Sequence, residues 1–307
     1  MKNSFAFVAL TLAAILTACG GNKKKDDINI SGAGVYVLVN NNHLWKDGVA
    51  HQLTTAWTAR VNSLHASGND VYVAGQYDGK ATLWKNGTRQ TVSSSTNSSS
   101  SEAHSVFVVD SDVYVAGYVG DYYGNANATL WKNGTAQILS NSESTATSVF
   151  VSGNDVYVAG RCDGKATLWK NGTAQILSNS GMANAVFVSG SDVYVAVDDY
   201  HDGPTLWKNG VGQCLAASGS ANSVFVSGND VYVAGQCDDK ATLWKNGVRQ
   251  ALSNNILTAA HSVFVSSDAV YCTGDGGVGK SIATLWKNGT AQQLPVGDYG
   301  LSIVVVE

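Results

Sequence analysis

The sequence predicts an all-β fold, a seven-bladed β-propeller of four-stranded antiparallel blades, from three observations. The triplet Leu-Trp-Lys occurs seven times, at intervals of 37 to 47 residues. Each copy contains four short runs in which apolar and polar residues alternate, a period of two that is typical of strands. A lone four-stranded sheet exposes both faces, so a repeat of about 40 residues indicates blades that stack on one another.

The repeat at residues 148–178 shows the elements of one blade in order. Its runs SVFV, DVYVA, ATLW and AQIL predict strands a to d, lettered from the axis outward. Ser-Gly-Asn-Asp joins strands a and b, and Lys-Asn-Gly joins c and d, where Asn-Gly accepts the positive φ angles of a tight hairpin. Aromatic residues at two fixed positions predict the core between blades, because each buried Trp removes about 150 to 250 Å² from water. They are the tryptophans of the seven triplets and Tyr36, Tyr72, Tyr114, Tyr157, Tyr194, Tyr232 and Tyr271.

The sequence contains one more candidate for strand a than for each of strands b, c and d. The choice between the candidates decides how the ring closes. Strands b, c and d occur seven times, whereas eight runs fit strand a, including residues 28–30 and residues 302–306. The run Ser-Ile-Val-Val-Val at the C-terminus fits the repeat better than Ile-Asn-Ile, so we predict that the C-terminal strand completes the first blade. The Ser31-Gly32 turn before Val35 leaves residues 28–30 as the alternative.

The first 27 residues predict an export signal followed by a tether. Residues 1–18 contain an apolar run too short to span a bilayer, which is typical of a signal peptide. The ending Leu-Thr-Ala-Cys at Cys19 resembles the bacterial lipobox, which implies cleavage before Cys19 and lipidation of its sulfur. Residues 19–27 are too hydrophilic to fold alone, so we expect a lipidated tether there and the propeller in residues 28–307.

The residue after the cysteine bears on the cellular location. Gly20 at this place resembles outer-membrane lipoproteins, which implies a membrane-anchored protein on the periplasmic or the cell-surface side of that membrane. The alternative is an ordinary signal peptide in which Cys19 is incidental.

Composition narrows the classes of partner. Charged residues make up 14% of the chain and the formal net charge is -4. No basic patch interleaves with aromatic residues, so we expect no binding to nucleic acid. The cysteines show no metal-binding spacing, and the acidic cluster at residues 198–202 matches no calcium loop, so we expect neither a metal nor a cofactor. We expect a monomer that touches the membrane only through the lipid on Cys19.

The full repeat unit reads A-x-S-V-F-V-S-G-N-D-V-Y-V-A-G followed by A-T-L-W-K-N-G. Over residues 28–307 it resembles the HAF-type extracellular repeats. That resemblance implies an exported β-repeat protein and no defined activity. The unit lacks the paired glycines of kelch repeats, the Gly-His and Trp-Asp of WD40 repeats and the Asp-box of sialidases.

Variation among the seven copies falls on one face of the predicted propeller. The a–b and c–d turns barely change and would form one face, the turn face, whereas all length variation lies in the b–c and d–a loops of the opposite loop face. The aromatic residues outside the repeat template also lie in these loops. One explanation is steric, because tight turns leave no room for extra aromatic residues. The other is function, because aromatic side chains among Asn, Asp and Ser suit a glycan or protein partner. The aromatic residues of these loops are Trp57, Tyr77, Tyr118, Tyr122, Tyr123, Tyr200 and Tyr299.

A second set of candidates comes from the residue just before strand a. In six copies it can form hydrogen bonds, and in the seventh it is Leu301. These side chains would surround the mouth of the central channel, where they would either bind a ligand or tie each blade to its neighbour. They are Asn62, His104, Thr147, Asn184, Asn222 and His261.

Catalytic motifs are missing from the sequence. No Gly-x-Ser-x-Gly elbow occurs, and no pair of carboxylates has a fixed spacing. We therefore expect a lipid-anchored, non-catalytic protein that binds a glycan or protein at its b–c and d–a loops. One alternative is a polysaccharide hydrolase or lyase with His104 and His261 at a central pocket, which acidic residues converging on these histidines would indicate. The other is an envelope assembly scaffold, which would present a flat apolar patch.

Overall fold

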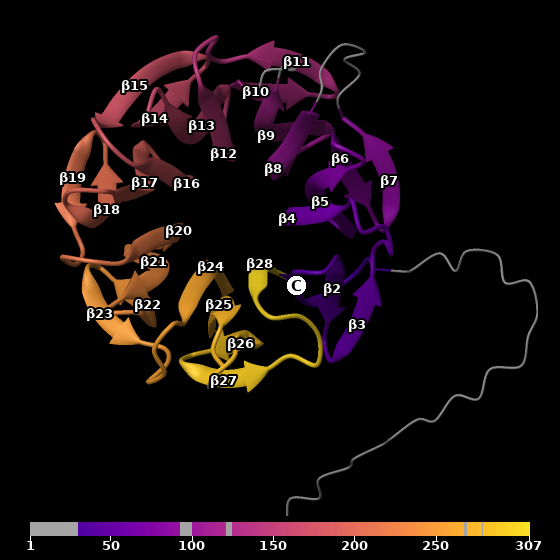
Figure 1. Ribbon diagram of the computed structural model, residues 1–307, viewed down its shortest axis with the longest axis vertical. Coiled ribbons are helices and arrows are strands. Elements are labelled where there is room, and N and C mark those ends of the chain that lie inside the picture. The colour runs from indigo at the N-terminus through magenta and orange to yellow at the C-terminus, as the bar shows by residue number, and fades with distance from the viewer. Residues whose placement is uncertain (1–29, 93–99, 121–124, 267–268, 278) are drawn as a thin grey trace, which may run out of the picture.

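Seven four-stranded antiparallel sheets surround a common axis in the computed structural model (Figure 1). The predicted seven-bladed β-propeller is thereby confirmed. The structure describes residues 30–92, 100–120, 125–266, 269–277 and 279–307. The predicted signal peptide, Cys19 and the tether lie outside these described residues. Helices are absent from the described part of the chain, so none there is long and apolar enough to cross a membrane.

The blades follow the order a to d from the axis to the rim, as the repeat predicts. The inner strands a are β28 (Gly300–Val306), β4 (Arg60–Ser67), β8 (Ser100–Val109), β12 (Ser144–Ser152), β16 (Met182–Ser189), β20 (Ser220–Ser227) and β24 (Ala259–Ser266). Strands b are β1 (Gly34–Val39), β5 (Asp70–Tyr77), β9 (Asp112–Gly120), β13 (Asp155–Cys162), β17 (Asp192–Asp199), β21 (Asp230–Cys237) and β25 (Ala269–Asp275). Strands c are β2 (His43–Lys46), β6 (Lys80–Lys85), β10 (Ala126–Lys132), β14 (Lys165–Lys170), β18 (Gly203–Lys208), β22 (Lys240–Lys245) and β26 (Ala283–Lys287). The outer strands d are β3 (Val49–Gln52), β7 (Thr88–Thr91), β11 (Thr135–Ile138), β15 (Thr173–Ser178), β19 (Val211–Cys214), β23 (Val248–Ala251) and β27 (Thr290–Gln293).

The C-terminal strand β28 completes blade 1, which confirms the predicted closure. It pairs antiparallel with β1, from Gly34 opposite Val306 to Val39 opposite Gly300. Figure 1 shows the C-terminal end of the chain inside the ring, next to the indigo first blade. Ile30 does not belong to a strand, and its side chain is fully buried in the core between blades 1 and 2.

The repeated tyrosines and tryptophans form the core between blades, as predicted. Trp169 of blade 4 packs in one cluster with Tyr114 and Leu130 of blade 3. Across the closing seam, Trp45 of blade 1 packs in the same way with Leu285 of blade 7. Neighbouring blades therefore share apolar cores around the whole ring.

Aromatic rings also contact one another around the axis, on the inner strands near the turn face. Consecutive ring centroids lie 4.7 to 5.0 Å apart. The Nε2–H of His65 donates to the carbonyl of Val108, and burial lowers the pKa of His65 to about 4. Hydrophobic rings thus surround the axis on the turn-face side, and the polar side chains of the inner strands lie toward the loop face. This aromatic belt comprises His65, Phe107, Phe150, Phe187, Phe225 and Phe264.

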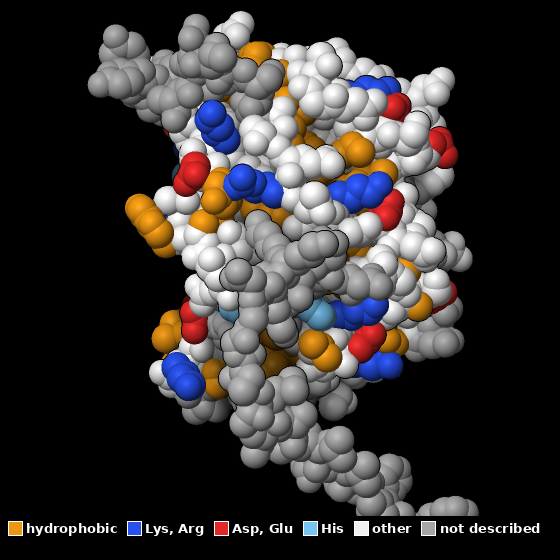
Figure 2. Space-filling view, turned by 90° about the vertical axis from the view of Figure 1, so that its right-hand side faces the viewer, with side chains coloured by type: hydrophobic (Ala, Val, Ile, Leu, Met, Phe, Trp, Pro, Cys, Tyr) orange, Lys and Arg blue, Asp and Glu red, His pale blue; other side chains and the backbone are white. Residues whose placement is uncertain are grey.

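A charged cluster recurs on the turn face of blades 2 to 6. In blade 4, Asp155 forms an ion pair of 2.7 Å with Lys170 and accepts a hydrogen bond from Asn171. These two contacts lower the pKa of Asp155. Its carboxylate therefore stabilises the fold above its unfolded pKa, and that contribution is lost as the pH falls through the folded pKa. Figure 2 shows basic and acidic side chains interspersed, rather than gathered, over the side it displays.

Ala269→Asp is expected to raise the melting temperature by about 1 to 3 °C. Blade 7 has Lys287 and Asn288 but carries Ala269 where blades 2 to 6 have the aspartate of this cluster. Differential scanning calorimetry measures the shift. The gain should vanish in a Lys287→Gln background, and an equal gain there would show that the new carboxylate acts without the lysine.

Each inner strand contains a β-bulge close to the loop face. In blade 4 the bulge lies at Thr147, between Ala146 and Ser148. A Cβ at Gly160 on the facing strand would lie 2.0 Å from the carbonyl oxygen of Thr145, so glycine is needed for this close approach. The polar residues that we predicted just before strand a lie inside it instead, because strand b continues and pairs with the residues that precede each bulge.

Candidate functional site

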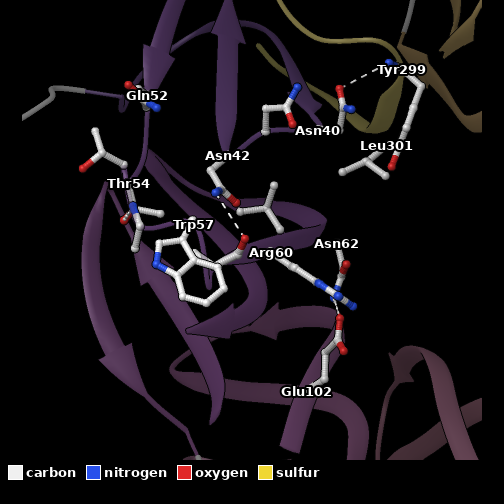
Figure 3. Close-up of a pocket in the computed structure, with 15 residues that line it drawn as sticks. Asn40, Asn42, Gln52, Thr54, Trp57, Arg60, Asn62, Glu102, Tyr299 and Leu301 are labelled. Carbon is white, nitrogen blue, oxygen red and sulfur yellow. Dashed lines mark hydrogen bonds between the residues drawn. The ribbon is translucent and has the colours of Figure 1, made fainter. Parts of the chain in front are cut away.

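A pocket of about 670 Å³ opens on the loop face at blades 1 and 2. Four segments build it: the β1–β2 loop, the β3–β4 loop with the start of β4, one residue of β8, and the end of the loop into β28 with the bulge that follows (Figure 3). Most of its lining is polar and dominated by amides and hydroxyls. We name it the blade 1–2 pocket, and its lining consists of Asn40, Asn41, Asn42, Gln52, Thr54, Thr55, Ala56, Trp57, Ala59, Arg60, Val61, Asn62, Glu102, Tyr299 and Leu301.

Two predicted aromatic residues line this pocket. The side chain of Trp57 is 93% exposed and that of Tyr299 is 38% exposed. Two hydrogen bonds hold the loop of Trp57. The Leu53 N–H donates to the Asn42 carbonyl, and the Asn42 side chain donates to the Ala59 carbonyl. An aromatic surface is therefore held open to solvent instead of packing into the core.

Asparagine side chains shape the other wall of the pocket. Asn41 and Asn42 have φ angles of 62° and 63°, a conformation that asparagine tolerates better than most residues. Asn40 joins the wall to the last connection of the chain, since its Oδ1 accepts the N–H groups of Asp298 and Tyr299 at 2.8 and 3.3 Å. Ring closure thus brings residues from both ends of the propeller together.

Charged groups lie at the end of the pocket nearest the axis. The buried carboxylate of Glu102 accepts hydrogen bonds from Asn62 at 2.9 Å and from the Tyr118 hydroxyl at 3.4 Å. Arg60 points into the same part of the pocket (Figure 3). Its side chain is exposed and makes no ion pair or hydrogen bond with another residue that the structure describes.

The six predicted polar residues of the inner strands connect neighbouring blades. Each side chain contacts a backbone carbonyl of the next blade at 2.5 to 3.0 Å. His104 and His261 use Nδ1, which must donate because a carbonyl only accepts. Asn62 alone among the six also lines the blade 1–2 pocket. The residues are Asn62, His104, Thr147, Asn184, Asn222 and His261.

The other predicted aromatic residues do not gather at this pocket. The guanidinium of Arg89 stacks on Tyr77, with its Cζ 3.7 Å from the centroid of the tyrosine ring. Tyr118 packs against the His104 ring, and Tyr200 is exposed on blade 5. Tyr122 and Tyr123 lie outside the described residues. The structure therefore brings together Trp57, Tyr299 and Asn62 from the predicted set.

Several residues near the axis escaped the sequence-based prediction. Arg60 begins β4, and Glu102 is the third residue of β8. The residue after the strand-b glycine varies from blade to blade: it is Arg161 in blade 4 and Asp275 in blade 7. Burial raises the pKa of its blade 5 counterpart, Asp198, against hydrogen bonds that lower it. Comparing the copies position by position along strand b, and not only in the loops, would have found this variation.

An acidic residue lies beside one of the predicted histidines, and another contacts the tyrosine that packs on the second. Asp275 Oδ1 is 3.9 Å from Nε2 of His261, and Glu102 contacts the Tyr118 that packs on His104. Across the part of the chain that the structure describes, no group of three or more His, Cys, Asp or Glu residues could hold a metal ion.

Comparisons with known proteins define the fold and nothing finer. No protein-family model and no curated protein matches this chain. Among solved structures, a puromycin-hydrolyzing peptidase of Mycobacterium tuberculosis is 10% identical, with a TM-score of 0.58 over 87% of this chain and 54% of that chain. The structure of a puromycin hydrolase is 11% identical, with a TM-score of 0.57 over 89% and 55%.

A third similar structure is an extracellular domain. It belongs to a one component system of B. thetaiotaomicron, is 12% identical and has a TM-score of 0.51 over 78% of this chain and 37% of that one. The chain thus spans little more than half the length of the two hydrolases and 37% of the extracellular domain. At such identities the likeness establishes the β-propeller fold alone.

Proposed function

We propose that this protein is a lipid-anchored, non-catalytic binding protein of the bacterial envelope that binds a glycan in the blade 1–2 pocket. One observation supports this above all: the exposed Trp57 ring lies in a concave site whose walls are rich in Asn, Gln and Thr. A sugar ring has an apolar face that packs on an indole and hydroxyls that pair with amides. The volume of about 670 Å³ also falls within the range of small-molecule sites, about 300 to 1,000 Å³.

The entry of the chain into the propeller supports a defined orientation. The Gly32 N–H donates to the carbonyl of Asn69 in an a–b turn, and Lys46 Nζ donates to the Ser31 carbonyl. Residues 31 and 32 are therefore held on the turn face. A lipid on Cys19, attached through at most about 43 Å of chain, would leave the blade 1–2 pocket facing away from the membrane surface. The proposed cellular location of the protein is the outer membrane, on its periplasmic or cell-surface side.

Trp57→Ala is expected to weaken glycan binding at least tenfold, because a central aromatic contact contributes about 2 kcal/mol or more. A glycan array with residues 28–307, followed by calorimetric titration of the best ligand, measures this. The melting temperature should not change, since the indole is exposed. Val248→Ala, which removes an exposed apolar side chain of β23 outside the pocket, should bind like the parent. A folded parent that binds no glycan would contradict the proposal.

A polysaccharide hydrolase or lyase is the second candidate. Asp275 beside His261 favours it, and so does Glu102, which contacts the tyrosine that packs on His104. Incubation of each bound oligosaccharide with the protein tests it. New reducing ends or the absorbance of a new double bond would support catalysis, and an unchanged ligand would support the binding protein.

A further inference from the structure

One cationic side chain lines the blade 1–2 pocket, and it is unpaired. Arg60 lies at the start of β4 and contributes to the pocket, and no acidic side chain of the described residues lies within ion-pair distance of it. Several other basic side chains are engaged. Lys170 pairs with Asp155, Arg249 pairs with Asp238, and Arg89 stacks on Tyr77. Arg161 on β13 also has a buried Nε without a hydrogen-bond partner in the described residues, but of these basic residues Arg60 lines the blade 1–2 pocket, where a ligand is expected.

The nearby acidic residue does not neutralise Arg60 by direct contact. Glu102 is 8% exposed, and its two oxygens accept hydrogen bonds from Asn62 and Tyr118. The Asn62 amide is itself fixed, because it also donates to the carbonyl of Ala103 at 2.9 Å. The carboxylate is thus held by its own blade and by a neighbouring blade, while the guanidinium remains open to solvent.

A free guanidinium in the same pocket as an exposed indole selects a particular kind of sugar. Arginine binds planar carboxylates with two parallel hydrogen bonds. Amide groups of Asn40, Asn42 and Gln52 line the same pocket and suit the hydroxyls of a sugar. We infer that the pocket binds a glycan containing a uronic acid, whose carboxylate pairs with Arg60 while the sugar ring lies against Trp57. This inference rests on the proposed function and names its ligand class.

Paired ligands separate the carboxylate from the rest of the sugar. Oligogalacturonate, oligomannuronate and hyaluronan oligosaccharides are each titrated beside their methyl esters, which keep the rings and remove the charge. We expect at least one free acid to bind ten times more tightly than its ester, with an affinity that falls as salt rises. Sulfated oligosaccharides without uronic acid form a further arm.

Variants of the chain test the role of Arg60. Arg60→Gln should lower the affinity for the acid to that for the ester, and Arg60→Lys, which keeps charge without the planar fork, should retain part of the difference. Arg249→Gln, a matched change on β23 outside the pocket, should keep the full preference. Glu102→Gln preserves shape and removes a nearby negative charge, so it should strengthen binding of the acid a few fold.

The outcomes distinguish this inference from the proposed function. Equal binding of acids and esters, preference for sulfated sugars alone, or a preference that survives Arg60→Gln in a folded variant would overturn the uronate assignment and leave glycan binding standing. No glycan binding by the folded parent would overturn both. A preference for one free acid that is lost with Arg60→Gln and kept with Arg249→Gln would establish the assignment.

Discussion

Deletion of residues 300–307 is expected to abolish cooperative unfolding of the propeller. The deletion removes β28, and with it the inner strand of blade 1 and the buried side chains of Ile303 and Val304. Burying an aliphatic side chain contributes about 1.5 to 3 kcal/mol, so these two account for about 3 to 6 kcal/mol. A whole domain is stable by only about 5 to 15 kcal/mol, and the loss also exposes an unpaired edge of β1.

Circular dichroism and calorimetry of the shortened chain measure this effect. A synthetic peptide of residues 298–307 should restore a cooperative transition when it is added in trans, because it can pair with β1 again. The same peptide with Ile303→Asp and Val304→Asp should not. A shortened chain that melts like the parent would show that ring closure does not depend on β28.

Trp169→Ala is expected to lower the free energy of unfolding by about 3 to 5 kcal/mol. The indole is 1% exposed and packs between blades 3 and 4, so its removal leaves a cavity that neighbouring strands cannot fill. Denaturant unfolding measures the loss. Trp169→Phe should lower the free energy of unfolding by clearly less. It keeps an aromatic ring and breaks no hydrogen bond, because the buried Nε1–H of Trp169 has no partner among the described residues.

Trp207 provides a matched control for this prediction. It occupies the same position in blade 5 but is only half-buried, because Gly212 stands opposite it where blade 4 has Ala174. Trp207→Ala should therefore destabilise the protein less than Trp169→Ala. Equal losses in the free energy of unfolding would contradict this prediction, because they would show that the loss depends on the residue type and not on packing between blades.

The candidate site was predicted only in part. Trp57 and Tyr299 stood out because they depart from the repeat, and Asn62 stood out because a polar residue recurs at its position. Arg60 and Glu102 did not, because they precede β-bulges whose existence depends on how two strands pair. The bulges lengthen the inner strands toward the loop face, and this brings both charged residues to the pocket.

The sequence by itself determined the blade and the number of blades, and it favoured the C-terminal strand over residues 28–30 for closing the ring. Strand alternation, hairpin turns and a repeat length are local properties, so they are written in consecutive residues. Only the tertiary structure decided which variable residues meet. Closure of the ring places Asn40 beside Tyr299, and stacking of blades 2 and 3 places Asn62 beside Glu102. Both contacts join residues that are distant in the sequence. A binding pocket is made of such contacts, and no local pattern in the sequence encodes them.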